Sequence, residues 1–396
     1  MIITYFLNLE LKCITLLHFS KTIMIIIRIL KIVFLGLSLS YSHGKPNINI
    51  TKSITDNYHL FPHEKPNEKD CPVVTGSIED RRDNRNNLRI MQYNVEWLFT
   101  EYFPPADCPG QGCPWNNETA AHTHIQYVSK VVNDLNPDIL NLCEIQGCVE
   151  LEELISNLNN KDQYKKYVIQ GEDTSTGQNV GLITKIDPSN GTLRRTDMRK
   201  EYPLPNSRCG YTGKSGTIEV SKHYITEFRL GNIDVVLIGS HFLAMPTASD
   251  RCAKREAQAT IIREVIEEYS SKDYEIIVMG DFNDYDNEIL DLNDHVPTSR
   301  VLDIIKYGER SNNELNSINL ISSEEKVQKK DRYSLWWDEN GDGKVESSEY
   351  AMIDFILVSP TIYNWVDDVV VYHGYDEGLN IYNSDHYPVY VDISVK

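Results

Sequence analysis

The chain has 396 residues, of which 41% are hydrophobic, so it is long enough for one large domain or two small ones. This composition excludes a fibrous protein and a wholly disordered one. The formal net charge of −19 at pH 7 argues against a protein that grips nucleic acid over its whole surface, because each phosphate contact normally needs a Lys or Arg. A local basic groove stays compatible with it, as does a metal ion that supplies the positive charge.

The first residues predict a secretory signal peptide. From Met24 the chain reads MIIIRILKIVFLGLSLSYS, in which Arg28 and Lys31 precede an apolar run that small residues follow. Because the run is too short to span a bilayer, we expect a cleaved signal over residues 1–43, with Met24 as the alternative start, rather than an uncleaved anchor. The mature protein is then expected to be extracellular, or in the lumen of the secretory or endolysosomal pathway, without stable membrane insertion.

Secretion permits disulfides, and seven of the eight cysteines follow the signal. An odd number leaves at least one thiol unpaired unless another chain supplies a partner. A local bridge between Cys108 and Cys113 is expected in DCPGQGCP, and Cys143, in the apolar run ILNLCEI, is the candidate free thiol. A bridge between Cys209 and Cys252 follows only by elimination. Triplets for N-glycosylation, which fit the same compartment, begin at Asn49, Asn117 and Asn190.

After a polar segment at 44–86, which we expect to be flexible, strand-like and helix-like stretches alternate. Strand patterns occur at 88–95, 137–145, 179–186, 223–230, 233–242, 274–283, 352–360 and 367–374, and helical patterns at 118–135 and 251–270. Gly231 and Asn232 join two of these strands and predict a β-hairpin, which a purely parallel doubly wound sheet would not contain. A mixed two-sheet sandwich with helices outside, in one domain over 87–396, fits better.

Polar residues stand where several apolar runs end. They occur in the strings QYNVEW at 92–97, LCEIQ at 142–146, GSHF at 239–242, GDFND at 280–284, IDFILVSP at 353–360 and SDHYP at 384–388. Carboxylates, carboxamides and imidazoles at strand ends are how an α/β protein assembles a metal-dependent phosphoryl site. The strings therefore predict such a site at one edge of the sandwich.

In this order the six strings resemble the endonuclease/exonuclease/phosphatase superfamily, the deoxyribonuclease-I-like fold, over residues 87–396. The resemblance implies a four-layered α/β/β/α sandwich, in which two mixed β-sheets pack face to face with helices outside. It also implies hydrolysis of phosphodiesters or phosphomonoesters with Mg²⁺ or a similar ion. Substrates in the superfamily include DNA, RNA, inositol phosphates and sphingomyelin.

Three residues are candidate metal ligands. Hydrolysis of an anionic phosphodiester needs a cation on its oxygens and a base that activates water. Glu144, which ends an apolar run, is the main candidate for a ligand of Mg²⁺ or Mn²⁺, and a solvated acid at a strand end is its alternative. By resemblance Asn94 touches metal or phosphate, unless it only caps a turn, and Asp385 is a second metal-linked carboxylate.

The GDFND string predicts residues that handle water and phosphate. Gly280 is expected to allow a tight turn, after which Asp281 and Asn283 point the same way because they lie two apart in an extended segment. The resemblance implies that Asp281 orients or deprotonates the attacking water and that Asn283 binds a phosphate oxygen. Asp284 points the opposite way and is expected at the surface or in a cap.

Two imidazoles complete the expected catalytic set. Asp354 lies in an apolar strand, where an acid needs a partner, and the resemblance makes that partner His386, whose tautomer and basicity Asp354 would set. His241 resembles the histidine that binds the scissile phosphate or protonates the leaving oxygen; its alternative is a hydrogen-bonded structural histidine. Which of His241, Asp281 and His386 is base and which is acid stays open.

Two loops carry candidate substrate contacts. In pancreatic-type nucleases a glutamate holds the histidine that corresponds to His241. The segment TGQNVGLI offers Gln178 or Asn179 in its place. Asn179 is also a candidate for substrate binding. The segment at 201–216 is expected to overhang the site, so Arg208 and Tyr211 could contact substrate phosphates. A solvated loop residue is the alternative for Arg208.

The segment DENGDGKVESSE, 338–349, matches a calcium loop at every position. Its expected ligands are Asp338, Asn340, Asp342, the carbonyl of Lys344, and Glu349 as the bidentate twelfth residue. An acidic surface turn is the alternative. Because only four residues separate the loop from Asp354, no full exiting helix can follow, and we expect structural Ca²⁺ rather than a calcium sensor.

These residues predict a secreted, Mg²⁺-dependent phosphodiester hydrolase, an endonuclease with DNA as the preferred substrate over RNA, acting as a monomer. A phospholipid or sphingomyelin phosphodiesterase with the same centre is the alternative among enzymes. A catalytically inactive, calcium-dependent binding module is the alternative from another class.

Overall fold

The computed structural model describes Cys71 and residues 77–100, 117–173, 176–308, 318–338, 344–374 and 383–395. The predicted signal peptide, the glycosylation triplet at Asn49 and the predicted bridge between Cys108 and Cys113 lie outside these residues. Among the described helices, none combines the length and the hydropathy that a membrane span needs.

A six-stranded mixed sheet forms one half of the domain. Its order is β14 (Val366–Val371), β15 (Val389–Ser394), β1 (Asn87–Leu98), β2 (Ile139–Ile145), β4 (Asn179–Thr184) and β3 (Lys165–Val168). β1 runs parallel to β2 and antiparallel to β15. The carboxyl ends of β1 and β2 and the beginning of β15 therefore share one edge.

A five-stranded mixed sheet forms the other half. Its order is β10 (Ile321–Ser322), β13 (Asp354–Val358), β9 (Glu275–Asp281), β8 (Ile233–His241) and β7 (His223–Leu230). β7 and β8 form the predicted hairpin, β8 runs parallel to β9, and β13 runs antiparallel to β9. Two small antiparallel pairs accompany the sheets: β5 (Lys200–Tyr202) with β6 (Gly216–Ile218), and β11 (Leu335–Trp336) with β12 (Tyr350–Ala351).

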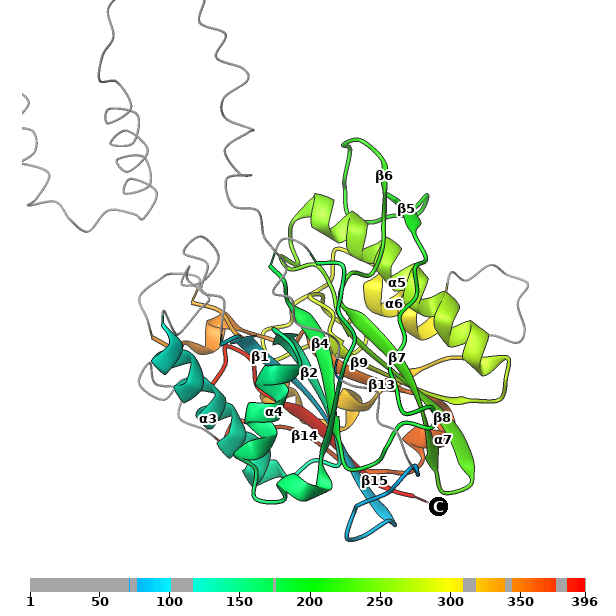
Figure 1. Ribbon diagram of the computed structural model, residues 1–396. Helices are drawn as coiled ribbons and strands as arrows, with labels where there is room; N and C mark the ends of the chain where they lie inside the picture. Colours follow the sequence, from blue (N-terminus) through cyan, green and yellow to red (C-terminus); the bar gives the residue numbers. More distant parts are fainter. Residues whose placement is uncertain are drawn as a thin grey trace, which may run out of the picture. The chain divides into compact units, whose positions relative to one another are not determined.

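Helices cover the outer faces of both sheets (Figure 1). On the side of the six-stranded sheet lie α3 (Glu118–Leu135) and α4 (Cys148–Ser156), and on the side of the five-stranded sheet lie α5 (Ser249–Ser270) and α6 (Val301–Tyr307). Short helices are α7 (Pro360–Tyr363) and the 3₁₀ turns η4 (Lys161–Gln163), η5 (Ser323–Lys326), η6 (Lys329–Asp331) and η7 (Ser347–Glu349). The predicted class, a sandwich of two mixed sheets with helices outside, is confirmed.

Helix α3 shows why the sequence folds this way locally. The side-chain oxygen of Asn117 accepts a hydrogen bond from the N–H of Ala120, which caps the first turn, and Asn136 ends the helix with a left-handed φ of 46°. The apolar residues lie on one face and include Ile125 and Val128, both fully buried. They pack against the outer face of the six-stranded sheet.

Alternation along β1 separates an apolar outer face from an inner face that becomes polar toward its carboxyl end. The outer face packs with α3 and carries Met91, Tyr93 and Val95. Leu88 and Ile90 point inward and join the core between the sheets. Gln92 and Asn94 continue this inward phase, and their amides contact residues of the opposite sheet. The strand thus delivers two buried carboxamides into the space between the sheets.

Gly280 stands inside β9, not in a turn, which corrects the sequence interpretation. It pairs with Ser240 of β8. A Cβ at this position would collide with the carbonyl oxygen of Ser240. The glycine therefore allows close approach of two backbones next to the predicted site, rather than a change of chain direction.

Disulfides and an ion pair fasten outlying segments to the domain. Cys209 bonds to Cys252 as predicted, and Cys143 is a buried free thiol as predicted. Cys71 bonds to Cys148 at the start of α4, a pairing that the sequence spacing does not indicate. Arg81 contacts Asp187 at 2.6 Å. Residues 77–86 are thus held against the domain, which differs from the flexibility predicted for that stretch.

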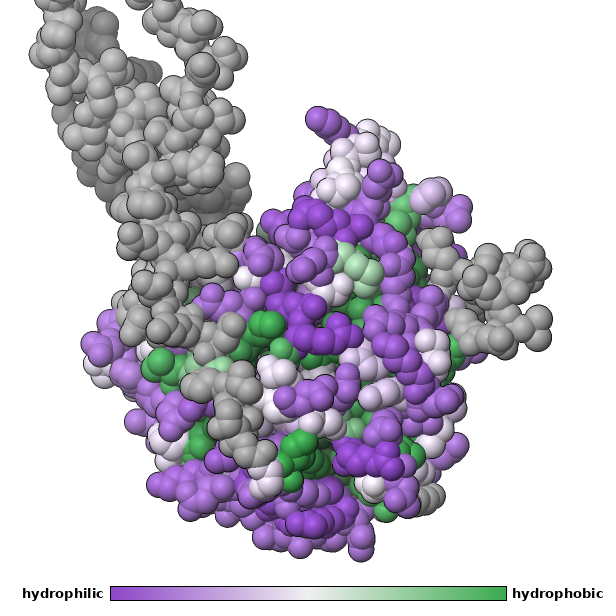
Figure 2. Space-filling model, turned by 45° about the vertical axis from the view of Figure 1, so that its right-hand side comes forward, coloured by the Kyte–Doolittle hydropathy of each residue, from purple (hydrophilic) through white to green (hydrophobic). Residues whose placement is uncertain are grey.

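The surface in Figure 2 is mostly hydrophilic, with hydrophobic residues scattered among polar ones. The large hydrophobic residues that are exposed in the described ranges are Ile78, Val149, Met245, Val296 and Trp337. Isolated exposures of this kind are normal for a globular surface.

Candidate active site

The residues predicted from the six strings meet at one edge of the two sheets. Asn94 and Glu144 come from the carboxyl ends of β1 and β2, His241 and Asp281 end β8 and β9, Asp354 begins β13, and Asp385 and His386 precede β15. The strand directions bring these ends together, because β13 is antiparallel to β9 and β15 is antiparallel to β1. The six strand ends therefore lie together at one edge, whereas the chemical roles of their residues stay predictions.

Asn94 is the hub of this cluster. Its Nδ2 lies 3.0 Å from Asp281 Oδ2, 3.4 Å from Glu144 Oε1 and 3.3 Å from His386 Nε2. Asn94 is 1% exposed, so these contacts take place out of bulk water. A neutral amide in this position links three titratable groups without adding to the negative charge of the site.

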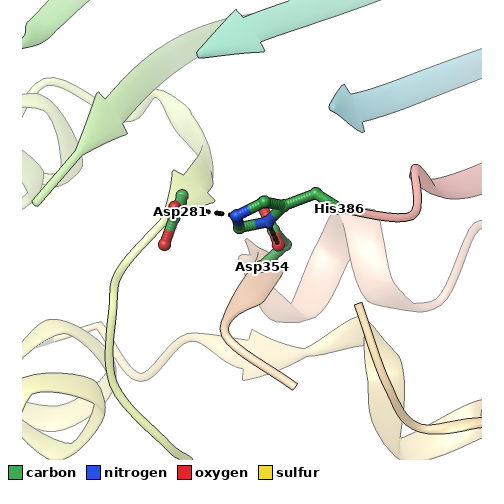
Figure 3. Close-up of side chains that lie close together, drawn as sticks. All are labelled: Asp281, Asp354 and His386. Carbon is green, nitrogen blue, oxygen red and sulfur yellow. Dashed lines mark hydrogen bonds and ion pairs between the residues drawn. The ribbon is translucent and has the colours of Figure 1, made fainter. Parts of the chain in front are cut away.

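Asp354 and His386 form a buried pair (Figure 3). Asp354 Oδ2 lies 2.7 Å from His386 Nδ1, as the resemblance implies. Sequence reasoning missed two further partners of Asp354: Ser334 Oγ donates to Oδ2 at 2.8 Å, and Gln92 Nε2 donates to Oδ1 at 2.9 Å. Burial opposes the charge of His386, but the carboxylates of Asp354 and Asp385 outweigh it and raise the pKa of the imidazole well above its ordinary value.

Asp281 faces both imidazoles. Its Oδ2 lies 3.7 Å from His386 Nε2 and 3.6 Å from His241 Nε2, while its Oδ1 accepts a hydrogen bond from the N–H of Asn283 at 2.8 Å. Burial, together with the charge of Asp354, raises the pKa of Asp281 to about 7. A carboxylate that titrates near neutral pH is suited to general-base catalysis. Asn283 lies beside it, but its Nδ2 donates to the carbonyl of Phe242 at 3.2 Å.

Three further carboxylates gather next to Asn94. The N–H of Asp385 donates to Glu96 Oε2 at 3.0 Å, and the N–H of Trp97 donates to Glu144 Oε2 at 3.3 Å. Burial and the charges of Asp385 and Glu144 raise the pKa of Glu96 well above its ordinary value, and burial raises the pKa of Asp385 to about 7. Within the described ranges no Lys or Arg pairs with these three acids.

The three acids fit a hard divalent cation. Mg²⁺ and Mn²⁺ prefer oxygen ligands, and buried carboxylates that repel one another are relieved when a cation binds among them. Glu144 and Asp385 are the predicted ligands, whereas Glu96 was not predicted. The sequence does place Glu96 two residues after Asn94 in QYNVEW. However, nothing in this string shows that the Glu96 carboxylate turns toward the site.

A second arrangement of ligands also exists. Asp281, Asp354 and His386 each offer one ligand atom, and these atoms lie within 4.8 Å of one another. However, Asp354 and His386 already satisfy each other across 2.7 Å, and Ser334 and Gln92 occupy Asp354 further. The described residues thus offer two candidate metal sets: Asp281, Asp354 and His386, whose ligand atoms lie close together, and Glu96, Glu144 and Asp385, whose carboxylates have fewer partners.

Three site residues have left-handed backbones. The φ values are 44° for Glu96, 66° for Glu144 and 50° for Asn283. This region is unfavourable for residues with a Cβ and concentrates at functional sites. Around Glu96 the pairing of β1 with β2 shifts register, between Asn94 and Leu98. Sequence patterns do not carry this information, because they predict strands rather than their terminal distortions.

His241 is buried and stands beside a lysine that sequence reasoning missed. Burial, followed by the charges of Lys222 and His386, lowers the pKa of His241 well below its ordinary value, so the ring is neutral. The backbone carbonyl of Lys222 accepts a hydrogen bond from the backbone N–H of His241 at 2.9 Å. The Nζ of Lys222 donates to Gln178 Oε1 at 3.0 Å. Lys222 stands just before the strand β7 and belongs to no recognisable motif. The sequence therefore gives no indication that it lies near the site.

The predicted support of His241 by Gln178 or Asn179 is not found. His241 Nδ1 has no hydrogen-bond partner in the described part of the chain. Gln178 instead accepts from Lys222, and Asn179 donates to the carbonyls of Gln146 and Gly177 and accepts from the N–H of Gly171. Because backbone groups occupy the amide of Asn179, the geometry favours a structural role for it over the predicted substrate contact.

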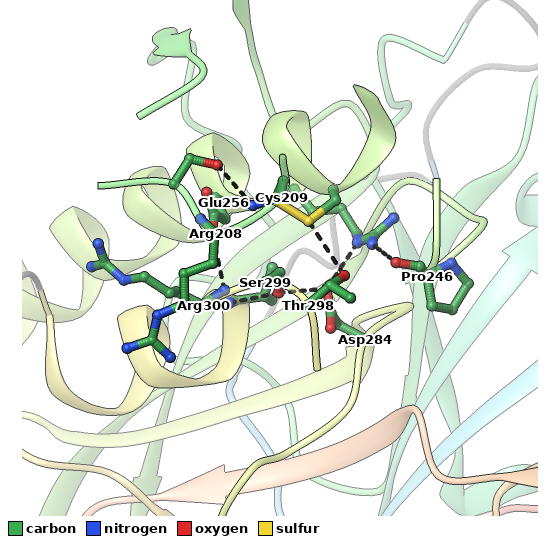
Figure 4. Close-up of a disulfide and its surroundings, with 12 residues drawn as sticks. Arg208, Cys209, Pro246, Glu256, Asp284, Thr298, Ser299 and Arg300 are labelled. Atoms are coloured by element: carbon green, nitrogen blue, oxygen red, sulfur yellow. Dashed lines mark hydrogen bonds and ion pairs between the residues drawn. A yellow bond between two sulfur atoms is a disulfide. The ribbon is translucent and has the colours of Figure 1, made fainter. Parts of the chain in front are cut away.

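Asp284 is not the surface residue that alternation predicts. It is 1% exposed, and its Oδ2 lies 3.2 Å from Nε of the fully buried Arg255 and 2.6 Å from Ser299 Oγ. Figure 4 shows Asp284 beside Ser299 and near Pro246. Arg255 also donates to the carbonyls of Leu243, Met245 and Pro246. The pair thus fastens the loop that follows His241 to the loop that follows Asp281.

The loop that carries Arg208 and Tyr211 is anchored to α5 (Figure 4). Cys209 bonds to Cys252, and the Glu256 carboxylate accepts from the N–H groups of Arg208 and Arg300 at 3.4 and 3.0 Å. Arg208 is exposed, while the Tyr211 hydroxyl donates to the Lys214 carbonyl. Their contact with substrate stays a prediction.

Of the predicted calcium ligands, Asn340 and Asp342 lie outside the described residues. Asp338, Lys344 and Glu349 are described. Glu349 Oε2 accepts a hydrogen bond from Trp336 Nε1 at 3.0 Å. Its Oε1 is buried and has no hydrogen-bond partner within the described ranges. A buried carboxylate oxygen of this kind can serve as a ligand of a hard cation.

No protein-family model and no curated protein sequence matches this chain. Solved structures that are similar include an endonuclease/exonuclease/phosphatase from Bacteroides vulgatus, with 16% identity over 78% of this chain and 99% of that chain at a TM-score of 0.48. A mannosyl-6-phosphatase from Bacteroides thetaiotaomicron has 15% identity over 77% and 98% of the two chains, with a TM-score of 0.45. TDP2 from D. rerio, complexed with a single-strand DNA product, has 14% identity over 77% and 98%, with a TM-score of 0.44.

The first of these structures is a protein of the superfamily that the six strings resemble. Identities of 14–16% and TM-scores below 0.5 say nothing about substrate. The functional proposals therefore rest on the residues of this chain.

Proposed function

We propose that this protein is a secreted, Mg²⁺-dependent phosphodiesterase that hydrolyses DNA by attack of water. The observation that carries the proposal is the hub at Asn94. Its amide Nδ2 donates to Asp281 and Glu144 and lies 3.3 Å from His386 Nε2, so a candidate base, a candidate metal ligand and an imidazole converge within 3.0 to 3.4 Å. Such a convergence of buried acids and imidazoles suits phosphoryl chemistry.

Each group has a distinct task in this proposal. Glu96, Glu144 and Asp385 would hold the Mg²⁺, which would supply positive charge near the phosphate. Asp281 takes the proton of the attacking water, because its pKa of about 7 matches neutral pH. His386, kept charged by Asp354, donates a hydrogen bond from Nε2 toward the phosphate.

Lys222 and His241 form the other wall of the proposed phosphate site. Lys222 brings a positive charge beside His241. The neutral His241 ring can donate one hydrogen bond to a phosphate oxygen or to the leaving oxygen. Lys222 Nζ also lies 3.7 Å from Asp173 Oδ2, so this acid balances part of its charge.

Secretion and structural calcium belong to the same proposal. The bridges Cys71–Cys148 and Cys209–Cys252 support an oxidising compartment. The unpartnered oxygen of Glu349 supports Ca²⁺ at the segment 338–349, whose central residues are not described. Mass spectrometry of the secreted protein tests removal of residues 1–43, and calcium titration followed by thermal unfolding tests the ion.

The decisive experiment compares substrates with one protein preparation. Purified protein is incubated with supercoiled plasmid, single-stranded RNA and sphingomyelin vesicles, in Mg²⁺ and then in EDTA. We expect metal-dependent nicking of the plasmid, its loss in Asp281→Asn, and its retention in the matched control Asp368→Asn, an exposed acid on β14. Turnover of sphingomyelin without nicking would establish the lipid alternative, and no turnover of any substrate would favour a binding module.

A further inference from the structure

Trp336 connects the end of the acidic segment 338–349 to the catalytic edge. Its side chain is almost fully buried, with 7% of the residue exposed, and its indole N–H donates to Glu349 Oε2 at 3.0 Å. The same carboxylate oxygen also accepts from the N–H of Glu346 at 3.3 Å. A buried hydrogen bond to a charged acceptor is about twice as strong as a neutral one. Glu349 is therefore a firm anchor for the indole.

The backbone of Trp336 holds the turn that carries the catalytic imidazole. Its N–H donates to the carbonyl of Asp385 at 2.8 Å, and the preceding residue, Leu335, forms an antiparallel bridge with His386. On the far side of His386, the N–H of Tyr387 donates to the Ser334 carbonyl at 2.7 Å. The turn at 385–387 is thus paired residue by residue with the segment 334–336.

The same segment also holds the acid that orients His386. Ser334 Oγ donates to Asp354 Oδ2 at 2.8 Å and accepts from the N–H of Asp354 at 3.0 Å. Three consecutive residues, 334–336, therefore contact both members of the Asp354–His386 pair and the metal-ligand candidate Asp385. A displacement of this segment by a fraction of an ångström moves all three groups together.

We propose that Trp336 is a positioning residue, whose indole, fastened to Glu349, sets the place of Asp385 and His386. This inference rests on the proposed phosphodiesterase function. In this inference Trp336 acts through the backbone of the turn. Glu349 thereby gains a role in catalysis that does not require it to contact the site.

A packing role for Trp336 makes a different prediction. The residue belongs to the large hydrophobic core, so Trp336→Phe also leaves a cavity, and the comparison of Glu349→Leu with Glu349→Gln separates the hydrogen bond from packing. Phenylalanine keeps much of the apolar surface but cannot donate a hydrogen bond. Trp337, the next residue, is exposed to 47% and supplies a matched control for the same substitution.

The test uses four variants of the full secreted chain in calcium-free buffer: Trp336→Phe, Glu349→Leu, Glu349→Gln and the control Trp337→Phe. We expect Trp336→Phe and Glu349→Leu each to lower kcat on plasmid about tenfold with little change in KM, as for a loss of transition-state positioning. Glu349→Gln keeps an oxygen that accepts from the indole and should stay within about threefold of wild type. Trp337→Phe should behave as wild type.

A second readout does not depend on turnover. Calorimetric titration with Mn²⁺ should show about tenfold weaker binding for Trp336→Phe and Glu349→Leu, because Asp385 is displaced. A fifth variant, which combines Trp336→Phe with Glu349→Leu, should bind Mn²⁺ no more weakly than either single variant, since both substitutions remove the same hydrogen bond. Wild-type kcat and Mn²⁺ affinity in folded Trp336→Phe, or equal losses in Trp337→Phe, would overturn the inference.

If Trp336→Phe does not fold, Glu349→Leu compared with Glu349→Gln decides the question. Rescue by glutamine supports the link, and equal behaviour of the two variants rejects it. Failure of the proposed function has another signature: wild type would cleave no phosphodiester, while the Mn²⁺ affinities would still separate the variants.

Discussion

Asp354 stands directly opposite Asp281 in the antiparallel pairing of β13 with β9, and His386 lies between their carboxylates. One carboxylate is hydrogen-bonded to Nδ1 at 2.7 Å, and the other lies 3.7 Å from Nε2. The two aspartates face each other across neighbouring strands, yet they contact different nitrogens of the same imidazole. Asp354 is paired with the ring at Nδ1, and Asp281 faces the ring at Nε2 while it accepts from Asn94 and Asn283.

Replacing Asp354 by asparagine should lower kcat by about 10²- to 10⁴-fold, the range seen when acid–base groups lose their correct state. The amide cannot keep His386 charged, and its N–H₂ can present the wrong hydrogen-bonding partner to Nδ1. Steady-state hydrolysis of plasmid or of bis(p-nitrophenyl) phosphate measures the loss. Asp368→Asn, on an exposed strand position, is the control, and a wild-type rate in Asp354→Asn would contradict the assigned role.

Metal affinity should rise with pH up to about 7. Burial raises the pKa of Asp385 to about 7, so the carboxylate must lose a proton before it can bind a cation. We expect Mn²⁺ binding to be about tenfold tighter at pH 8 than at pH 6, with release of protons that calorimetry in two buffers can count. Glu96→Gln should weaken Mn²⁺ binding at both pH values. A pH-independent affinity would exclude this ligand set.

Glu324 should make the protein less stable as pH rises. Its carboxyl is fully buried, and burial raises its pKa to about 7, against an ordinary value of 4.5. A group whose pKa is raised on folding contributes stability below its unfolded pKa, and this contribution is lost as pH rises through the folded pKa. Between pH 4.5 and 7 the wild type should therefore lose roughly 3 kcal/mol, at about 1.4 kcal/mol for each pKa unit.

Urea unfolding of wild type and Glu324→Gln between pH 4 and 8 tests this expectation. The glutamine variant keeps an oxygen for the N–H of Ile356, which donates to Glu324 at 2.7 Å, but it cannot ionise. It should match wild type near pH 4 and exceed it at pH 8. Parallel pH profiles of the two proteins would show that Glu324 is not the group responsible.

The bridge between Cys209 and Cys252 should contribute about 4 kcal/mol, because it closes a loop of 43 residues in the unfolded chain. Replacement of both cysteines by alanine should lower the urea midpoint by the corresponding amount. It should affect kcat less than Asp354→Asn does, because the bridge anchors α5 and its loop rather than a reacting group. An unchanged midpoint would mean that the unfolded state is not constrained by this bridge.

Local periodicity predicted much of the fold. The helix expected at 118–135 and the hairpin around Gly231 and Asn232 have the expected residues, because each depends on neighbours along the chain. The strand β15 was not predicted, since its short run follows Pro388 closely and pairs with β1 across nearly the whole domain. The bridge Cys71–Cys148 was also out of reach, because cysteine spacing does not define pairing.

In the candidate site, too, some residues could be predicted from the sequence and others could not. Asn94, Glu144 and Asp281 stand at strand ends within recognisable strings, so their meeting at one edge was predictable. Lys222 and Ser334 enter through tertiary contacts alone, with no pattern around them. Asp284 was misplaced because alternation assumes a continuing strand, whereas the backbone leaves the extended conformation at Asn283, whose φ is 50°.

The left-handed backbones at Glu96, Glu144 and Asn283 mean that heat resistance and catalytic competence oppose one another at this edge. Glycine relieves such a conformation by roughly 1 kcal/mol. It would also remove the carboxylates and the amide that the chemistry needs. Selection for thermal stability alone would therefore favour glycine at these positions and remove the proposed activity. Stabilising substitutions should be sought at other positions.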